Sequence, residues 1–214
     1  MNNLILFRNL RSFINWQRIK FRNKKPILEK EYYEWCNNGK PIPPPHIVKQ
    51  KTIKAFQNRF NVNVLVETGT FMGEMVYAQR NIFSKIISIE LSEELHLSAK
   101  RRLNKYPHVE LLQGDSGEVL KNLVPKIREP AIFWLDGHYS GFETAKGELT
   151  TPIEKELDTI LISTLEHIIL IDDARLFNGK DDYPTIENIK EMVLSRKPEL
   201  SINVEDDIIR IYPN

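Results

Sequence analysis

The stretch that decides the fold of this chain is residues 62–73, V-N-V-L-V-E-T-G-T-F-M-G. Its apolar run, Val64 to Val66, predicts a buried strand that ends at an acid. Two glycines then predict a tight turn, and a helix is expected to begin near Glu74. Glycine lets a backbone pass close to a ligand because it has no Cβ atom. In an open parallel sheet this turn lies at the carboxyl ends of the strands, where such folds bind their ligands.

The acid at the start of the turn indicates which class of ligand the turn binds. A dinucleotide site carries G-x-G-x-x-G, whereas this chain has E-x-G-x-x-x-G, with Glu67 where the first glycine would fall. A carboxylate repels a pyrophosphate but attracts an ammonium group. The pattern resembles the first motif of the class I S-adenosylmethionine (SAM)-dependent methyltransferases, and an ordinary strand–turn–helix is the plain alternative. The resemblance implies a set of cofactor-binding residues in the turn: Glu67, Gly69, Thr70, Phe71 and Gly73.

Length and composition predict one globular domain, alone or with an arm. The chain has 214 residues, of which 41% are hydrophobic and 28% charged, as in ordinary globular domains. No run reaches the ~20 apolar residues that a membrane-spanning helix needs. Cys36 is the single cysteine, which excludes an intramolecular disulfide and a cysteine-based zinc site. We therefore expect a cytoplasmic protein.

Charge is distributed unevenly along the chain. Residues 1–60 hold 13 Lys and Arg against 3 Asp and Glu, whereas residues 61–214 hold 17 against 26. Residues 1–25 carry no acid, and their apolar side chains recur near helical spacing. Such a segment suits peripheral contact with an anionic membrane, or docking on its own domain or on a partner in a homodimer, and docking is favoured. The acidic body argues against nucleic-acid binding.

The domain division follows from the prolines. Five prolines lie between residues 26 and 45, and the run Pro43-Pro44-Pro45-His46 predicts a stiff, extended connector. Residues 1–45 are interpreted as a basic arm with this proline-rich connector, and residues 46–214 as the SAM-dependent methyltransferase domain. A helix is expected over residues 46–60, with His46 and Lys49 as weak site candidates near the cofactor.

The next two strand ends complete the expected cofactor site. Residues 85–90 predict a second buried strand that ends at Glu90, 17 residues after Gly73. An acid at this point of a parallel α/β unit accepts hydrogen bonds from ribose hydroxyls, and Leu91 lies beside it. Residues 109–113 predict a third strand, and the family resemblance implies that Asp115 and Ser116 after it contact the adenine ring. The alternative is that they cap the next helix.

Carboxylates follow the fourth and fifth predicted strands. The apolar run 131–135 is followed by Asp136 in the string D-G-H-Y-S-G, and the run 167–171 by Asp172 and Asp173. Neighbouring parallel strands bring their carboxyl ends together, and an oxygen-rich cluster suits Mg²⁺, Ca²⁺ or Mn²⁺. A pair of loop and cap residues is the alternative. The string lacks the proline pair and aromatic of the nucleic-acid base methyltransferases of this fold, which argues against base methylation.

Here the sequence resembles the metal-dependent sugar O-methyltransferases of the macrocin O-methyltransferase type. The resemblance implies that Asp136, Asp172 and Asp173 are metal ligands. It also implies that Asp136 is the catalytic base and belongs to the cofactor-binding residues. His138 is a second candidate for the base because its ordinary pKa lies nearer neutrality. Further strings, such as H-I-V-K and L-I-D-D-A-R, resemble a bacterial group of methyltransferases associated with surface-polysaccharide loci. The candidates for contact with the acceptor are His138, Tyr139, Thr144 and Arg175.

The end of the chain predicts the closing elements of the fold. A helix is expected over residues 185–194, followed by strands over 200–204 and 208–212. The predicted fold is therefore an α/β Rossmann-like class I methyltransferase sandwich. It has a seven-stranded, mostly parallel sheet, an antiparallel C-terminal hairpin and an N-terminal helical arm.

The predicted function is SAM-dependent O-methylation of a small polar acceptor, a sugar or glycan of surface polysaccharide, assisted by Mg²⁺. Two alternatives stay open. The first is a nicotinamide-dependent oxidoreductase, against which the missing G-x-G-x-x-G counts. The second is a non-catalytic protein that keeps the SAM-binding fold.

Overall fold

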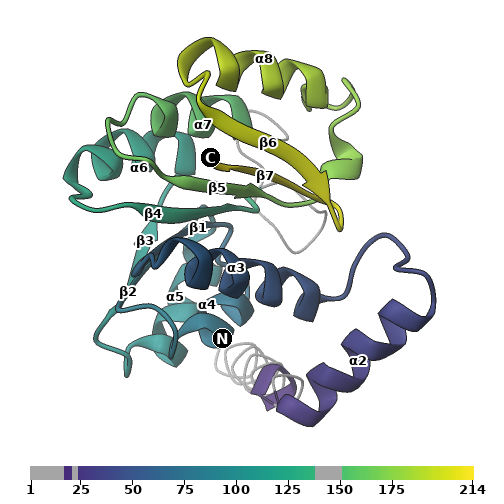
Figure 1. Cartoon of the computed structure of the whole chain (residues 1–214). Coiled ribbons are helices and arrows are strands. Elements are labelled where there is room, and N and C mark those ends of the chain that lie inside the picture. Colours follow the sequence, from purple (N-terminus) through teal and green to yellow (C-terminus); the bar gives the residue numbers. More distant parts are fainter. Residues whose placement is uncertain (1–16, 21–23, 138–150) are drawn as a thin grey trace.

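A computed structural model describes residues 17–20, 24–137 and 151–214 of the chain (Figure 1). Its centre is a seven-stranded sheet in the order β3-β2-β1-β4-β5-β7-β6. The strands β1 to β5 run parallel, and β7 runs antiparallel to both β5 and β6. Their bounds are β1 Val64–Thr68, β2 Lys85–Glu90, β3 Val109–Gln113, β4 Ala131–Leu135, β5 Ile168–Ile171, β6 Leu200–Glu205 and β7 Ile208–Pro213. The predicted fold class is confirmed, including the C-terminal hairpin.

Helices cover both faces of the sheet. Figure 1 shows α3, α4 and α5 on one face and α6, α7 and α8 on the other. The bounds are α2 Lys25–Asn37, α3 His46–Phe60, α4 Glu74–Gln79, α5 Glu93–Leu103, α6 Ser116–Leu123, α7 Ile153–Leu161 and α8 Ile186–Arg196. Two short 3-10 helices, η1 Val124–Lys126 and η2 Ala174–Leu176, follow α6 and β5. A parallel sheet covered on both faces explains why its strands are continuous apolar runs.

Alternation along each strand sorts the core into two layers. In β1, Val64 and Val66 pack with the apolar side chains of α6, α7 and α8, whereas Leu65 packs with those of α3, α4 and α5. The same alternation sends Trp134 of β4 and Leu170 of β5 to the α3 side. Successive strand residues point to opposite faces. The residue two positions after Leu65, Trp134 or Leu170 therefore faces α3 as well. These three residues are Glu67, Asp136 and Asp172.

Local signals in the sequence explain where several helices begin. The Ser92 hydroxyl accepts a hydrogen bond from the backbone N–H of Leu95 at 3.3 Å, which caps α5 as the sequence predicts. Helix α8 starts with a capping box between Thr185 and Asn188. Each side-chain cap satisfies a backbone donor that the helix leaves unpaired. The helix starts are thus fixed by residues just outside the apolar pattern.

The sequence predicts no helix over residues 25–37, where the structure has α2. Pro26 lies in the first turn of α2, where its missing N–H costs nothing. Trp35 is buried and its ring N–H donates to the carbonyl of Pro41 at 2.8 Å. The ammonium of Lys51 on α3 lies 3.3 Å from a carboxylate oxygen of Glu29 on α2. These contacts hold α2 against α3.

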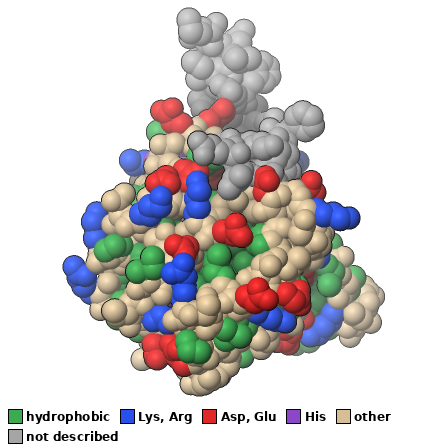
Figure 2. Space-filling model, turned by 90° about the horizontal axis from the view of Figure 1, so that it is seen from above, with side chains coloured by type: hydrophobic (Ala, Val, Ile, Leu, Met, Phe, Trp, Pro, Cys, Tyr) green, Lys and Arg blue, Asp and Glu red, His purple; other side chains and the backbone are tan. Residues whose placement is uncertain are grey.

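Part of the basic arm packs on the domain. Ile19, within the short described segment 17–20, is buried in the core layer of α3, α4 and α5. This contact agrees with docking of the arm on its own domain, at least over these residues. Within the described parts of the chain, every helix is too short or too polar to cross a membrane. Figure 2 shows the face on the side of α6, α7 and α8, where basic and acidic side chains are interspersed.

Candidate functional site

The turn after β1 requires glycine because two backbones meet there. Gly69 has φ +86°, and its N–H donates to the carbonyl of Ile89 at 2.9 Å. A Cβ atom at Gly69 would lie 2.3 Å from the carbonyl oxygen of Asp136. This glycine gives a close approach between the ends of β1 and β4, and the close approach to a ligand stays a prediction from the sequence. The turn and the end of β4 therefore form one rigid unit.

The second glycine of the turn fixes the position of the following helix. Gly73 has φ +72° and precedes α4. A Cβ atom there would lie 2.8 Å from Cδ1 of Leu103 on α5. Gly73 therefore lets the turn pack closely against α5, and this contact helps to hold the turn in position.

Glu67 is a buried acid at the carboxyl end of β1. It is 2% exposed and accepts a hydrogen bond from the hydroxyl of Ser88 on β2. That hydroxyl also lies 2.5 Å from the hydroxyl of Thr70. Burial raises the pKa of Glu67 to about 8, the hydrogen bond from Ser88 opposes this rise, and the charges of Asp136 and Glu90 add to it. The side chain thus holds a proton near neutral pH in the absence of a cationic neighbour.

This raised pKa predicts how stability depends on pH. The folded protein holds a proton on Glu67 between the ordinary pKa of 4.5 and about 8, whereas the unfolded chain has lost it. The contribution of Glu67 to the unfolding free energy is fully present below the ordinary pKa of 4.5. It falls as the pH rises toward the folded-state pKa of about 8, by at most about 1.4 kcal/mol per pH unit. Glu67→Gln removes this loss, so its unfolding free energy relative to the wild type should increase between about pH 5 and about pH 8. Urea denaturation across this range measures the difference.

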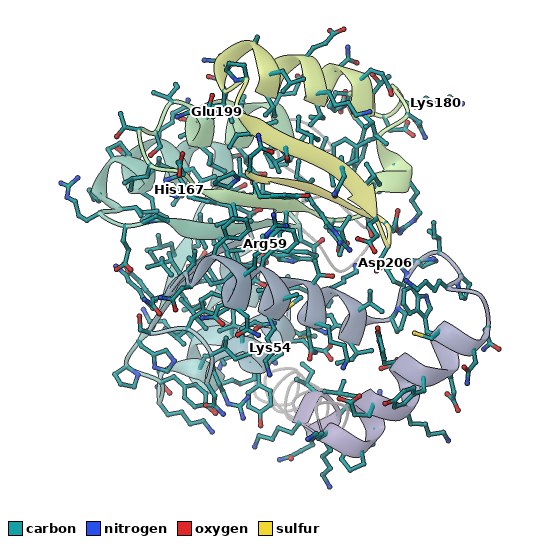
Figure 3. The ribbon with its side chains drawn as sticks, viewed as in Figure 1. Lys54, Arg59, His167, Lys180, Glu199 and Asp206 are labelled. Atoms are coloured by element: carbon teal, nitrogen blue, oxygen red, sulfur yellow. The ribbon has the colours of Figure 1, made fainter. Side chains whose placement is uncertain are left out.

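A matched substitution provides the control for this prediction. Glu199 is exposed before β6 (Figure 3), so Glu199→Gln should keep the pH profile of the wild type. Parallel profiles for Glu67→Gln and the wild type would contradict a raised pKa at Glu67.

Glu90 lies at the carboxyl end of β2 with its carboxylate held in place. One oxygen accepts from the backbone N–H of Phe71 at 2.7 Å and the other from that of Ser92 at 2.9 Å. Glu90 is 6% exposed. Each carboxylate oxygen has two acceptor positions, so these contacts orient the group and leave further acceptor capacity. Leu91 follows directly, and its carbonyl accepts from the side chain of Gln113 at 2.9 Å.

The residues predicted to meet adenine lie at the start of α6. Asp115 accepts from the backbone N–H of Glu118 at 3.2 Å and caps the helix. Ser116 is buried as the first residue of that helix. The capping alternative of the sequence is therefore observed, and one carboxylate can cap the helix and accept from a ligand as well.

Asp136 and Asp172 extend the ladder between the parallel strands. The N–H of Asp136 donates to the carbonyl of Thr68 at 3.1 Å, and the N–H of Asp172 donates to the carbonyl of Leu135 at 3.0 Å. This register places the ends of β1, β4 and β5 side by side. Asp172 is 2% exposed, and its Oδ1 atom is buried without a hydrogen-bond partner among the described residues.

Lys49 of α3 supplies a positive charge to these acids. Its ammonium forms an ion pair with Oδ2 of Asp172 and lies 3.6 Å from Oδ1 of Asp173. Burial lowers the pKa of Lys49, but attraction to Asp172, Asp136 and Asp173 outweighs it, so the pKa lies above its ordinary value. Lys49 is therefore charged, and α3 brings this charge to the sheet end from far away in the sequence.

The second acid of the pair has another cationic neighbour. Arg175 donates from Nη1 to Oδ1 of Asp173 at 2.8 Å, and its guanidinium also pairs with Asp207. The backbone N–H of Arg175 donates to Asp207 at 2.8 Å. Arg175 was predicted to contact the acceptor, and its bonds to Asp207 tie it to the turn of the C-terminal hairpin.

The acids do not form an open metal site. Among residues 17–20, 24–137 and 151–214, no group of three or more His, Cys, Asp or Glu side chains is arranged to hold a metal ion. The ammonium of Lys49 binds Oδ2 of Asp172, and the guanidinium of Arg175 binds Oδ1 of Asp173. A donor set that already holds two cations does not fit a divalent ion.

Three predicted site residues lie outside the described part of the chain, and two residues of the site were not selected from the sequence. His138, Tyr139 and Thr144 fall outside the described residues. The sequence did not single out Ser88 or Tyr183, although a lone polar residue within the apolar run 85–90 is a signal for Ser88. Burial and the carboxylates of Asp173 and Asp136 raise the pKa of Tyr183 above its ordinary value. Glu156 of α7 is buried, with its Oε1 atom 3.3 Å from the position of a Cβ at Gly137.

The chain was compared with known proteins. No protein-family model and no curated protein sequence matches it. Among solved structures, it is similar to the O-methyltransferase TomG from Streptomyces achromogenes in complex with SAM, with 16% identity, a TM-score of 0.58, and coverage of 87% of this chain and 89% of that one.

Two further solved structures give the same result. The O-methyltransferase from Bacillus cereus in complex with S-adenosylhomocysteine (SAH) has 15% identity and a TM-score of 0.55, covering 88% of this chain and 91% of that one. The SAH-bound methyltransferase PaMTH1 from Podospora anserina has 17% identity and a TM-score of 0.51, covering 87% of each. At these identities the similarity establishes the fold, which is that of the class I methyltransferases.

Proposed function

We propose that this protein is a SAM-dependent O-methyltransferase that acts on a small polar acceptor. The observation that carries the proposal is the gathering of Glu67, Glu90 and Asp136 around one glycine turn, close enough for Asp136 and Glu90 to raise the pKa of Glu67. Carboxylates that repel each other are stabilised by a cation. SAM carries both an ammonium and a sulfonium group, and it suits this site.

The same charges weigh against the main alternative. A nicotinamide dinucleotide would bring a pyrophosphate to the turn after β1, where Glu67 stands in place of the first glycine of its fingerprint. The similar structures support the same choice of cofactor, because those of Streptomyces achromogenes and Bacillus cereus are described in complex with SAM and SAH.

Four polar residues around the turn have a proposed contact with the cofactor. Glu67 would attract the ammonium of the cofactor, and the oriented carboxylate of Glu90 would accept from its ribose hydroxyls. Asp115 and Ser116 would lie beside the adenine ring at the start of α6. The cofactor supplies a methyl group on a cationic sulfur.

The acceptor is proposed to be a hydroxyl group of a sugar or glycan. Asp136 lies at the end of β4 beside the glycine turn, and it would accept the proton of this hydroxyl as the oxygen attacks. His138 is the other candidate for this role. A polar acceptor suits the exposed Arg175 and the polar string that follows β4, and an acceptor from surface polysaccharide remains a prediction from sequence resemblance.

Isothermal titration calorimetry tests the cofactor. SAM and SAH should bind the purified protein, and NAD⁺ should not. Glu90→Gln should weaken SAM binding by about tenfold or more, because a hydrogen bond to a charged group contributes about 1.5–3 kcal/mol. The control is Glu110→Gln, a substitution at an exposed acid on β3. Binding of NAD⁺ in place of SAM would overturn the proposal, and SAM binding without turnover on any sugar would favour the non-catalytic alternative.

A further inference from the structure

Lys49 occupies the position at which sequence resemblance implied a metal ion. Its side chain descends from α3 onto the ends of β4 and β5, and only 16% of it is exposed. Ile47, Ile53 and Phe56 are buried on the same helix, so α3 is anchored in the core and the lysine is held in place. The ammonium contacts Asp172 and Asp173 and is attracted by Asp136.

We propose that the ammonium of Lys49 is the fixed cation of this site and binds the hydroxyl oxygen of the acceptor in place of a divalent metal. The part of this inference that concerns the acceptor rests on the proposed function. The part that concerns the cation rests on the contacts of Lys49 alone.

The charge balance supports a lysine and opposes a metal in the same place. Mg²⁺ requires oxygen ligands at about 2.0–2.1 Å in octahedral geometry, and Oδ2 of Asp172 is already bonded to Lys49. A second, divalent charge beside the ammonium would be repelled. Removing the ammonium would leave buried carboxylates without compensation, which is unfavourable unless a proton or another cation takes its place.

One carboxylate oxygen of the cluster can still accept a hydrogen bond. Oδ1 of Asp172 is buried and has no hydrogen-bond partner among the residues that the structure describes. An ammonium carries three N–H donors, and the two carboxylates of the Asp172–Asp173 pair account for two contacts of Lys49. A hydroxyl can both accept from the lysine and donate to a carboxylate, so an alcohol acceptor matches the groups that the site offers.

The chemical step balances with these residues. The acceptor O–H bond breaks and its proton goes to Asp136, while an O–CH₃ bond forms and the C–S bond of the cofactor breaks. The electron pair of the C–S bond stays on sulfur, which becomes a neutral thioether. Lys49 donates a hydrogen bond to the oxygen and stabilises the negative charge that develops on it.

Binding of Mn²⁺, followed by the electron paramagnetic resonance signal of the free ion, tests the inference without any assay of activity. The wild type should bind no Mn²⁺ at concentrations at which Lys49→Ala does, and Lys49→Ala should gain at least about tenfold in affinity because the carboxylates lose their cation. Lys54→Ala is the matched control, since Lys54 is an exposed lysine on the same helix (Figure 3). The double variant Lys49→Ala with Asp172→Asn should lose the gained site.

The outcomes separate the inference from the proposed function. Binding of Mn²⁺ by the wild type as tightly as by Lys49→Ala would overturn it, and so would a folded Lys49→Ala that binds no Mn²⁺. Circular dichroism checks the folding, and Lys49→Gln replaces the alanine variant if that variant does not fold. These results do not depend on SAM, so failure of the cofactor proposal leaves them interpretable.

An activity measurement then tests the contact with the acceptor. EDTA should leave the rate of the wild type unchanged, and Lys49→Ala should lower kcat by about 100-fold or more, the usual effect of losing a donor to a developing negative charge. Added Mn²⁺ should restore part of the rate of Lys49→Ala only. Loss of wild-type activity in EDTA would overturn the proposal that lysine replaces the metal.

Discussion

Replacing Gly69 by alanine is expected to destabilise the protein by about 3 kcal/mol or more and to abolish SAM binding. The added Cβ atom would lie 2.3 Å from the carbonyl oxygen of Asp136, and a backbone atom cannot move aside as a flexible side chain can. The positive φ of Gly69 adds strain for any other residue. The ends of β1 and β4 must separate, and the proposed cofactor and acceptor positions separate with them. Urea denaturation and calorimetry with SAM measure the two effects.

Gly39 offers a matched control for this prediction. It has φ +79°, close to that of Gly69, but a Cβ atom there would meet nothing within 4 Å. Gly39→Ala therefore carries the backbone strain without the collision, and should cost about 1–2 kcal/mol and leave SAM binding intact. Equal effects of the two substitutions would show that the contact between the turn and β4 has no special role.

The second large effect is expected from Asp136→Asn. Asparagine keeps the size of the side chain but cannot accept a proton from a hydroxyl, so methyl transfer should fall by about 1,000-fold or more, within the range attributed to general base catalysis. SAM affinity should change by only a few fold, since Glu67 and Glu90 remain. Single-turnover rates and calorimetry measure the two quantities separately.

Asp181→Asn provides the control for this substitution, because Asp181 is exposed after η2. It should change neither quantity. If Asp136→Asn keeps the wild-type rate while His138→Ala loses it, the role of base passes from Asp136 to His138.

The fold was predictable because its signals are local. The central parallel strands β1, β2, β4 and β5 are largely apolar runs, and an acid such as Glu67 or Asp136 stands at or just past the carboxyl end of the run. Strand alternation alone is enough to predict that Glu67, Asp136 and Asp172 face one side of the sheet. Helix α2 was missed, although Pro26 occupies the one helical turn that tolerates proline.

The candidate site was only partly predictable because its charges come from distant parts of the chain. Asp172 and Lys49 are 123 residues apart in sequence, and a lysine near the start of a helix is ordinarily a solvated residue. The pattern of three acids therefore indicated a metal. The pattern did not reveal that Lys49 on α3 supplies the positive charge that stabilises these acids. The buried bond between Glu67 and Ser88 likewise depends on the pairing of β1 with β2.

The carboxylates around the glycine turn have a consequence for turnover under the proposed function. Methyl transfer converts a cationic sulfur into a neutral one, whereas the carboxylates of Glu67, Glu90 and Asp136 carry the same charges as before once Asp136 has released the acceptor's proton to solvent. S-adenosylhomocysteine therefore lacks an electrostatic attraction that SAM has, so replacement of the bound product by SAM is favoured after each cycle. Product inhibition should accordingly weaken at low ionic strength, where the difference between the two ligands is screened least.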